Sequence, residues 1–131
     1  MAKLLIIEDD PRLEQTYNTL FERSGHAVVR AHDGEEGLRM AETENPDMIL
    51  LDMLMPKMHG LEFLKRYDLK NKHPNVKVIV FSNMESEDLL TQAMELGAVR
   101  YEVKSRFSPN ELAHLVNETL HDRPQSDPTK E

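Results

Sequence analysis

Several polar residues that could handle a phosphoryl group follow directly after short apolar runs of this sequence. They are Glu8 and Asp9 after one run, Asp52 after a second, Ser82 after a third and Lys104 after a fourth. Carboxylates that lie close together need a counter-charge, which Mg²⁺ or Mn²⁺ can supply because these ions prefer oxygen ligands. Phosphoryl transfer needs a nucleophile, a metal ion and further donors that spread the charge. If these residues meet, Asp52 is the candidate nucleophile, and Lys104 and Ser82 are the candidate donors.

The elements that would position these residues alternate between apolar runs and amphipathic stretches. Strands are predicted over Lys3–Ile7, Ala27–Ala31, Met48–Leu51, Val76–Phe81 and Val99–Val103. Helices are predicted over Pro11–Ser24, Gly34–Glu44, about Leu61–Asn71, Glu87–Leu96 and a last stretch from Pro109 to about residue 121 that begins with a capping box. This alternation predicts an α/β fold with a parallel sheet covered on both faces. Five such units favour the flavodoxin-like, doubly wound (βα)5 fold with strand order 2-1-3-4-5.

In that strand order, strands 1, 3, 4 and 5 are consecutive neighbours, and their carboxyl ends share one rim. Each candidate residue also has an ordinary explanation. Glu8 could be a loop acid, Asp52 could start a turn, Ser82 could lie in a loop and Lys104 could be a surface lysine, while Asp10 before Pro11 fits a helix N-cap. Together, these explanations require four unrelated coincidences at the one edge where such folds place their sites.

Composition limits the classes of function. The 131 residues carry a net charge of −8, and nucleic-acid binding depends on basic residues, so we expect no direct binding to nucleic acid. No apolar run approaches the ~20 residues that cross a bilayer, and the N-terminus does not read as a signal peptide. The chain has no cysteine, which fits a cytoplasmic location. We predict one domain over residues 1–121 and a polar, disordered tail over residues 122–131.

The order of these motifs resembles the receiver domain of response regulators in two-component signalling. The motifs are IIEDD, then ILLDMLMPKMHG, then VIVFS and then YEVK, and the resemblance spans about residues 3–121. It implies that Asp52 takes a phosphoryl group from the phosphohistidine of a sensor histidine kinase or a histidine phosphotransfer protein, in an Mg²⁺-dependent step. It also implies that Asp9, Asp52 and the backbone carbonyl of Leu54 bind the metal directly, while Glu8 acts through water.

The resemblance further implies a switch. Ser82 and Tyr101 correspond to the family's switch pair, in which the hydroxyl moves toward the phosphate and the aromatic ring swings inward. The ordinary explanation for Tyr101 is a half-buried aromatic of a strand. The surface of the fourth helix, fifth strand and fifth helix would then change shape, and a protein partner would bind to it. Whether phosphorylation also drives dimerisation stays open.

The sequence departs from the family pattern beside the candidate site. Lys104 is followed by Ser105, where the family usually has a proline in a cis peptide, and we expect a trans bond here. Asn83 stands where the family usually has a smaller residue, and it could narrow access to the phosphate. The side chains of Leu54 and Met84 cannot orient an attacking water, which predicts a long-lived acyl phosphate.

Several classes of function compete. The leading hypothesis is a signalling module that is not an enzyme acting on a separate substrate. A phosphatase with an aspartyl-phosphate intermediate would want an acid–base residue where Leu54 stands. A flavodoxin-like cofactor carrier would need Ser, Thr or Gly where the acidic EDDP stands. A receiver that only scaffolds stays open because Ser105 follows Lys104.

Overall fold

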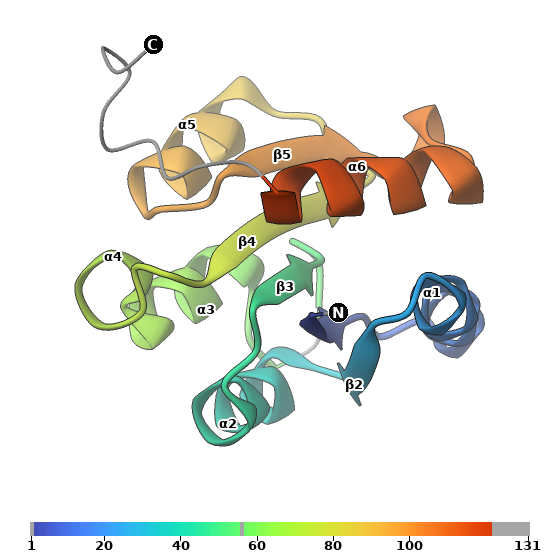
Figure 1. The fold of residues 1–131 in the computed structure, drawn as a ribbon. Helices are drawn as coiled ribbons and strands as arrows, with labels where there is room; N and C mark the ends of the chain where they lie inside the picture. The colour runs from blue at the N-terminus through green and yellow to red at the C-terminus, as the bar shows by residue number, and fades with distance from the viewer. Residues whose placement is uncertain (1, 56, 122–131) are drawn as a thin grey trace, which may run out of the picture.

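Short aliphatic runs form the centre of the molecule. The structure is a computed structural model that describes residues 2–55 and 57–121, so the predicted tail over residues 122–131 lies outside the described residues. The strands are β1 (Lys3–Ile7), β2 (Ala27–Ala31), β3 (Met48–Leu51), β4 (Lys77–Ser82) and β5 (Arg100–Val103). All neighbouring strands are parallel, and their order is β2-β1-β3-β4-β5 (Figure 1). The predicted strand order is therefore confirmed.

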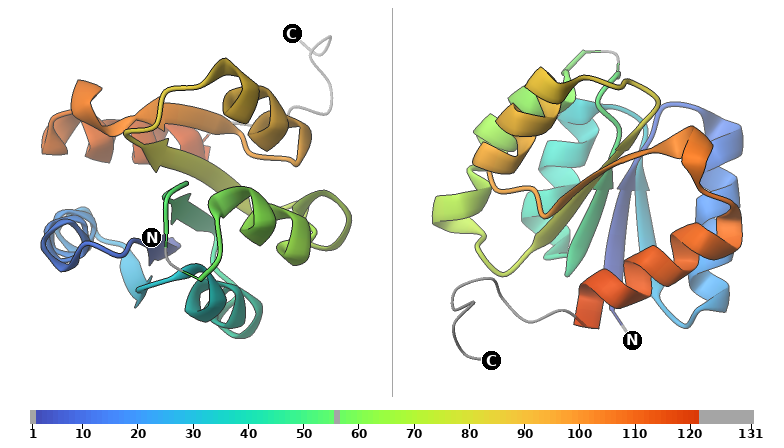
Figure 2. Two further views of the ribbon diagram at one scale, coloured as in Figure 1. Left: turned by 180° about the vertical axis from the view of Figure 1, so that it is seen from behind. Right: turned by 90° about the horizontal axis from the view of Figure 1, so that it is seen from above.

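Helices cover both faces of this sheet. They are α1 (Pro11–Arg23), α2 (Gly34–Glu44), α3 (Gly60–Tyr67), α4 (Leu69–Lys72), α5 (Glu87–Glu95), the short 3₁₀ helix η1 (Lys104–Arg106) and α6 (Pro109–His121). Figure 2 shows α1 and α6 on one face and α2, α3 and α5 on the other. The doubly wound α/β architecture is the one that the alternation of strands and helices predicts.

The side chains of β1 alternate between two halves of the core. Leu4 and Ile6 pack in the cluster beneath α1 and α6, while Leu5 and Ile7 pack in the cluster beneath α2, α3 and α5. All four are almost completely buried, and burial of an aliphatic side chain of this size contributes about 1.5–3 kcal/mol each. A strand held on both faces has little freedom to shift, so it fixes the position of the residues that follow it.

One predicted element is wrong in its extent. The single helix expected over about Leu61–Asn71 is divided into α3 and α4 at Asp68, whose backbone is left-handed with φ 56°. The Asp68 amide donates to the carbonyl of Leu64, and its carboxylate accepts a hydrogen bond from the Asn71 side chain. Aspartate tolerates this conformation because its short side chain can hydrogen-bond locally. The apolar spacing continues across the break, so the pattern alone could not show it.

Candidate functional site

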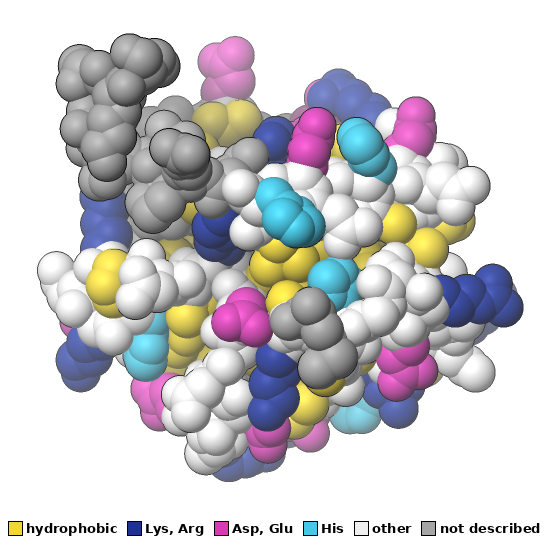
Figure 3. Space-filling view, in the orientation of Figure 1, with side chains coloured by type: hydrophobic (Ala, Val, Ile, Leu, Met, Phe, Trp, Pro, Cys, Tyr) yellow, Lys and Arg dark blue, Asp and Glu magenta, His cyan; other side chains and the backbone are white. Residues whose placement is uncertain are grey.

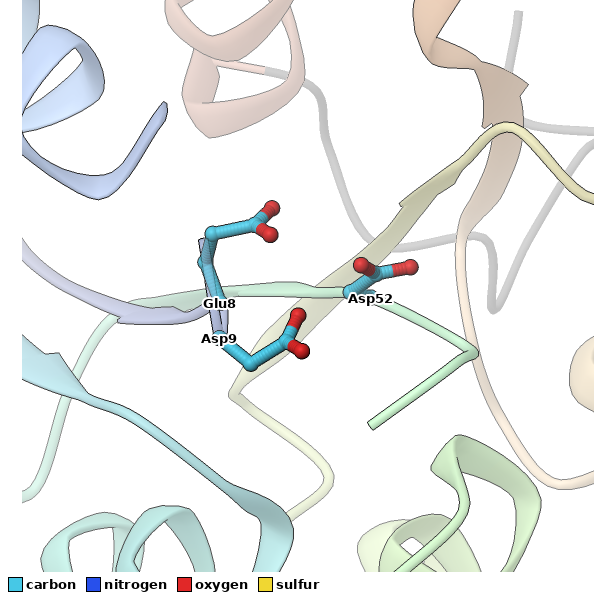
Figure 4. Close-up of side chains that lie close together, drawn as sticks. All are labelled: Glu8, Asp9 and Asp52. Atoms are coloured by element: carbon cyan, nitrogen blue, oxygen red, sulfur yellow. The ribbon is translucent and has the colours of Figure 1, made fainter. Parts of the chain in front are cut away.

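Three carboxylates meet at the carboxyl ends of β1 and β3. Ile7 lies opposite Leu51 in the parallel register, so the residues that follow the two strands become neighbours. Oxygen atoms of Glu8, Asp9 and Asp52 lie within 4.8 Å of one another (Figure 4). Glu8 and Asp52 are buried, while Asp9 is exposed. The structure therefore brings together the acidic residues on which the predicted site depends.

Lys104 supplies a positive charge to two of these acids. Its Nζ lies 2.7 Å from Oε1 of Glu8 and 3.0 Å from Oδ2 of Asp52. Burial on its own would lower the pKa of Lys104, but the hydrogen bond to Glu8 and the charges of Asp52 and Glu8 outweigh burial and raise that pKa above its ordinary value. The ammonium form is thus the one that this site stabilises.

Glu8 shows the opposite balance. Burial raises the pKa of Glu8, and the negative charge of Asp52 adds to this effect, so the contact with Lys104 lowers the pKa only in part and the net direction is upward. The Asp10 amide also donates to Oε2 of Glu8 over 3.2 Å. The upward pKa shifts of Lys104 and Glu8 are compatible with each other. Lys104 faces two acids, whereas Glu8 is buried and faces one cation and a second acid.

The donor set fits a hard divalent cation. Glu8, Asp9 and Asp52 carry three negative charges, and Lys104 neutralises only one of them. All the donors are oxygens, which are the ligands that Mg²⁺ and Mn²⁺ prefer. A further positive charge would relieve the remaining repulsion between the acids. The acidic cluster can therefore hold a metal ion.

The backbone after β3 lies beside the nucleophile candidate. The Leu54 amide donates to Oδ1 of Asp52 over 3.3 Å, and Leu54 is 50% exposed. Leu54 is thus near the acids, as predicted, and the metal-binding role of its carbonyl stays a prediction. Asp10 has the ordinary role anticipated for it, because its carboxylate caps α1 by accepting from the Arg12 amide over 2.9 Å.

The loop between β4 and α5 connects the predicted switch residues. Ser82 is buried at the end of β4, and its Oγ accepts a hydrogen bond from the Met84 amide over 3.2 Å. The Tyr101 hydroxyl donates to the Met84 carbonyl over 2.5 Å. Burial first, and then the charge of Asp52, raise the pKa of Tyr101, whose ring is half-buried. Both residues therefore hold the same loop residue, and their movement on phosphorylation stays a prediction.

Two contacts in this region were not found from the sequence. Asn83 Oδ1 accepts a hydrogen bond from the Ser105 amide over 3.0 Å, and Arg106 pairs with Glu85. The sequence predicts for Asn83 only that it narrows access to the phosphate. An asparagine at a strand end can accept from a backbone amide, but no spacing rule connects positions 83 and 105. The Lys104–Ser105 peptide bond is trans, as expected.

Comparison with known proteins places the chain in a family. Residues 4–117 match the response regulator receiver domain, and the chain belongs to this family. Two relatives from Bacillus subtilis (strain 168) match over 118 residues, or 90% of this chain. The alkaline phosphatase synthesis transcriptional regulatory protein PhoP is 36% identical and is covered over 48% of its length. Sporulation initiation phosphotransferase F is 32% identical and is covered over 93%.

Solved structures show the same fold. The receiver domain of Francisella response regulator 1452 is 32% identical with a TM-score of 0.80, and the match covers 92% of this chain and 97% of that one. A CheY-like receiver domain protein from Methanospirillum hungatei JF-1 is 27% identical with a TM-score of 0.84, covering 92% and 94%. The chain spans about half the length of PhoP and of several other curated relatives.

The described surface carries charges of both signs. On the face shown in Figure 3, basic and acidic side chains are interspersed. Within residues 2–55 and 57–121, none of the helices combines the length and the apolar character that a bilayer crossing requires. The expectation of no direct nucleic-acid binding stays a prediction.

Proposed function

We propose that this chain is a phospho-accepting receiver in which Asp52 takes a phosphoryl group from a phosphohistidine. The observation that carries the proposal is the position of Lys104 Nζ, 2.7 Å from Glu8 and 3.0 Å from Asp52, two acids that cluster with Asp9. An oxygen of Asp52 would attack phosphorus as the P–N bond breaks, and the imidazole would leave with the bonding electrons. The donor would be a sensor histidine kinase or a histidine phosphotransfer protein.

The residues around Asp52 would hold the metal ion and stabilise the charge of the phosphoryl group. Mg²⁺, or Mn²⁺ in its place, would be held by Asp9, Asp52 and the Leu54 carbonyl, with Glu8 acting through water. A bound ion would neutralise negative charge on the phosphoryl oxygens. Lys104 would turn from the acids to one phosphoryl oxygen and stabilise it as a point charge.

The output of the switch would pass through the β4–α5 loop. If the Ser82 hydroxyl turns toward a phosphoryl oxygen, it gives up its hydrogen bond with the Met84 amide, and the Tyr101 contact to the same residue must adjust. The predicted surface of the fourth helix, fifth strand and fifth helix corresponds to α5, β5 and α6. Leu90 and Met94 of α5 are exposed there. We propose that a protein partner, or a second copy of this chain in a phosphorylation-dependent dimer, binds to this surface.

The chain would act as a signalling protein and not as an enzyme with a separate substrate. It would take part in its own phosphorylation and in slow autodephosphorylation, and the absence of cysteine supports a cytoplasmic site of action. The paired ammonium of Lys104 supports phosphate acceptance over a purely scaffolding role. Leu54 stands where an aspartyl-phosphate phosphatase would want an acid–base residue, which disfavours that alternative.

The test is incubation with Mg²⁺ and acetyl phosphate, followed by measurement of the intact mass. The wild-type chain should gain the mass of one phosphoryl group, and the gain should need Mg²⁺. Asp52→Ala should show no gain, while Asp47→Ala, at the opposite end of β3, should gain the same mass as wild type. A wild-type chain that gains no mass under any condition would move the assignment to a scaffold.

A further inference from the structure

We propose that Asn83 is a positioning residue for Lys104. It holds the backbone directly after Lys104, whose ammonium would bind the phosphoryl group. This inference rests on the proposed function. It assigns a role in phosphoryl transfer to a side chain that belongs neither to the acidic cluster nor to the proposed donors Lys104 and Ser82. The observation behind it is a single hydrogen bond between two loops that lie 22 residues apart in sequence.

This hydrogen bond joins two residues, each of which directly follows in sequence a residue that would contact the phosphoryl group. Asn83 directly follows Ser82, and Ser105 directly follows Lys104. The carboxamide oxygen Oδ1 of Asn83 accepts from the Ser105 amide over 3.0 Å. The two loops that carry the donor side chains are therefore connected through Asn83.

Lys104 needs such a connection because the sheet ends immediately before it. Val103, paired with Ser82, is the last residue of β5. Lys104 then opens the single turn of η1, closed by a 3.2 Å hydrogen bond from the Phe107 amide to the Lys104 carbonyl. The pairing with β4 thus fixes the chain before Lys104, and Asn83 fixes it directly after.

The two residue types are matched to each other. A proline at position 105 would lack the amide hydrogen that Asn83 receives, and an alanine at position 83 would lack the acceptor. Asn83 and Ser105 directly follow Ser82 and Lys104, the two proposed hydrogen-bond donors to the phosphoryl group. They are also the two positions there at which the sequence departs from the family pattern. In the structure these departures form one contact, next to a trans Lys104–Ser105 peptide bond.

A small displacement of Lys104 matters because phosphoryl transfer depends on the placement of charge. A shift of about 1 Å at a reacting group can cost on the order of 100-fold in rate. Asn83 is exposed, so loss of its hydrogen bond should change the overall stability little. The effect of Asn83 should therefore appear in the rate of phosphorylation and not in the folding of the domain.

The experiment measures phosphorylation by acetyl phosphate at saturating Mg²⁺, together with the Mg²⁺ dissociation constant. Asn83→Ala should lower the phosphorylation rate by about tenfold. Its Mg²⁺ affinity should stay within about twofold of wild type, since Asn83 is not one of the acids. Asn75→Ala is the matched control because this exposed asparagine precedes the opposite end of β4, and its rate should equal that of wild type.

Two further measurements separate positioning from other roles. Hydrogen exchange of the Ser105 amide should become faster in Asn83→Ala. In a Lys104→Gln background, Asn83→Ala should cause no additional loss of rate, because Asn83 acts through Lys104. An equal loss in both backgrounds would overturn the inference, as would a wild-type rate for Asn83→Ala alone. If the wild-type chain accepts no phosphoryl group, the proposed function fails first.

Discussion

Lys104 is the residue whose position explains most of the chemistry proposed for the site. It lies between Glu8 and Asp52, and its pKa is raised because these acids outweigh the cost of burial. It is the one cation within 4 Å of this acidic pair among the described side chains. If Asp52 is phosphorylated as proposed, the long side chain of Lys104 would let the ammonium move from the acids to a phosphoryl oxygen.

Replacement of Lys104 by glutamine should slow phosphorylation of Asp52 by about 100- to 1,000-fold, the usual effect of removing one donor that stabilises developing charge. Mg²⁺ should still bind, because the acids remain. Lys3→Gln is the matched control, since Lys3 lies at the other end of β1 and pairs with Glu44. Rates from intact-mass time courses test this, and a Lys104→Gln rate close to wild type would refute the role of the ammonium.

Met84 and Leu54 should determine how long the acyl phosphate persists. Neither side chain can hold a water in line for attack, so we expect slow autodephosphorylation. Met84→Asn should speed the loss of phosphate by about tenfold or more, because an amide can orient the water. Met94→Asn, on α5, is the control and should leave the rate unchanged. Fast wild-type loss that Met84→Asn does not alter would count against this explanation.

The helix α2 begins at a well-defined cap, which offers a test. Asp33 Oδ1 accepts a hydrogen bond from the Glu36 amide over 2.8 Å at the start of α2. This hydrogen bond, aided by the charge of Lys57 and opposed by slight burial, lowers the pKa of Asp33 below its ordinary value of 3.8. The ionised Asp33 carboxylate therefore stabilises the folded domain at pH values above its ordinary pKa. This contribution is lost as the pH falls through the lower pKa that Asp33 has in the folded state.

Asp33→Ala should reduce the free energy of unfolding by about 1 kcal/mol at pH 7. Asp33→Asn keeps an oxygen acceptor and should stay close to wild type at pH 7. As the pH falls below 4, wild type should lose stability relative to Asp33→Asn, since only wild type carries the titrating cap. Urea unfolding at several pH values measures this difference, and a constant difference across that range would exclude the titrating cap.

The individual elements also show which parts of the structure were predictable. The five strands were found within one residue at each end, since parallel buried strands give continuous aliphatic runs. The break at Asp68 was missed because it is a backbone event inside an unbroken apolar pattern. The contact between Asn83 and Ser105 was missed for another reason, since it depends on how two loops meet after the sheet has formed.

Across the whole molecule, the site was predictable because topology does the positioning. Once strand order 2-1-3-4-5 is assumed, the carboxyl ends of β1, β3, β4 and β5 must lie at one edge of the sheet. The structure brings together there the acids that follow β1 and β3 and the lysine that follows β5. Residue types alone could not show that Glu8 and Lys104 form an ion pair at 2.7 Å, or that Ser82 accepts from Met84. Those details depend on side-chain conformations that only the packed structure defines.

Metal binding should stabilise the whole domain by mass action. At about ten times its dissociation constant, Mg²⁺ should raise the free energy of unfolding by about 1.4 kcal/mol, since we expect it to bind only the folded acidic cluster. Asp9→Asn should abolish most of this gain. Asp88→Asn, on the exposed start of α5, should keep it. Thermal unfolding with Mg²⁺ or with a chelator measures the effect, and equal midpoints for wild type in both would contradict the metal site.

We propose that one particular carboxylate, that of Asp52, accepts the phosphoryl group. After reaction with acetyl phosphate and Mg²⁺, borohydride reduction converts an aspartyl phosphate to homoserine, which peptide mass spectrometry can locate. We predict homoserine at position 52 alone. Homoserine at position 9 or 10 instead, or at no position in a chain that has gained a phosphoryl group, would show that Asp52 is not the acceptor.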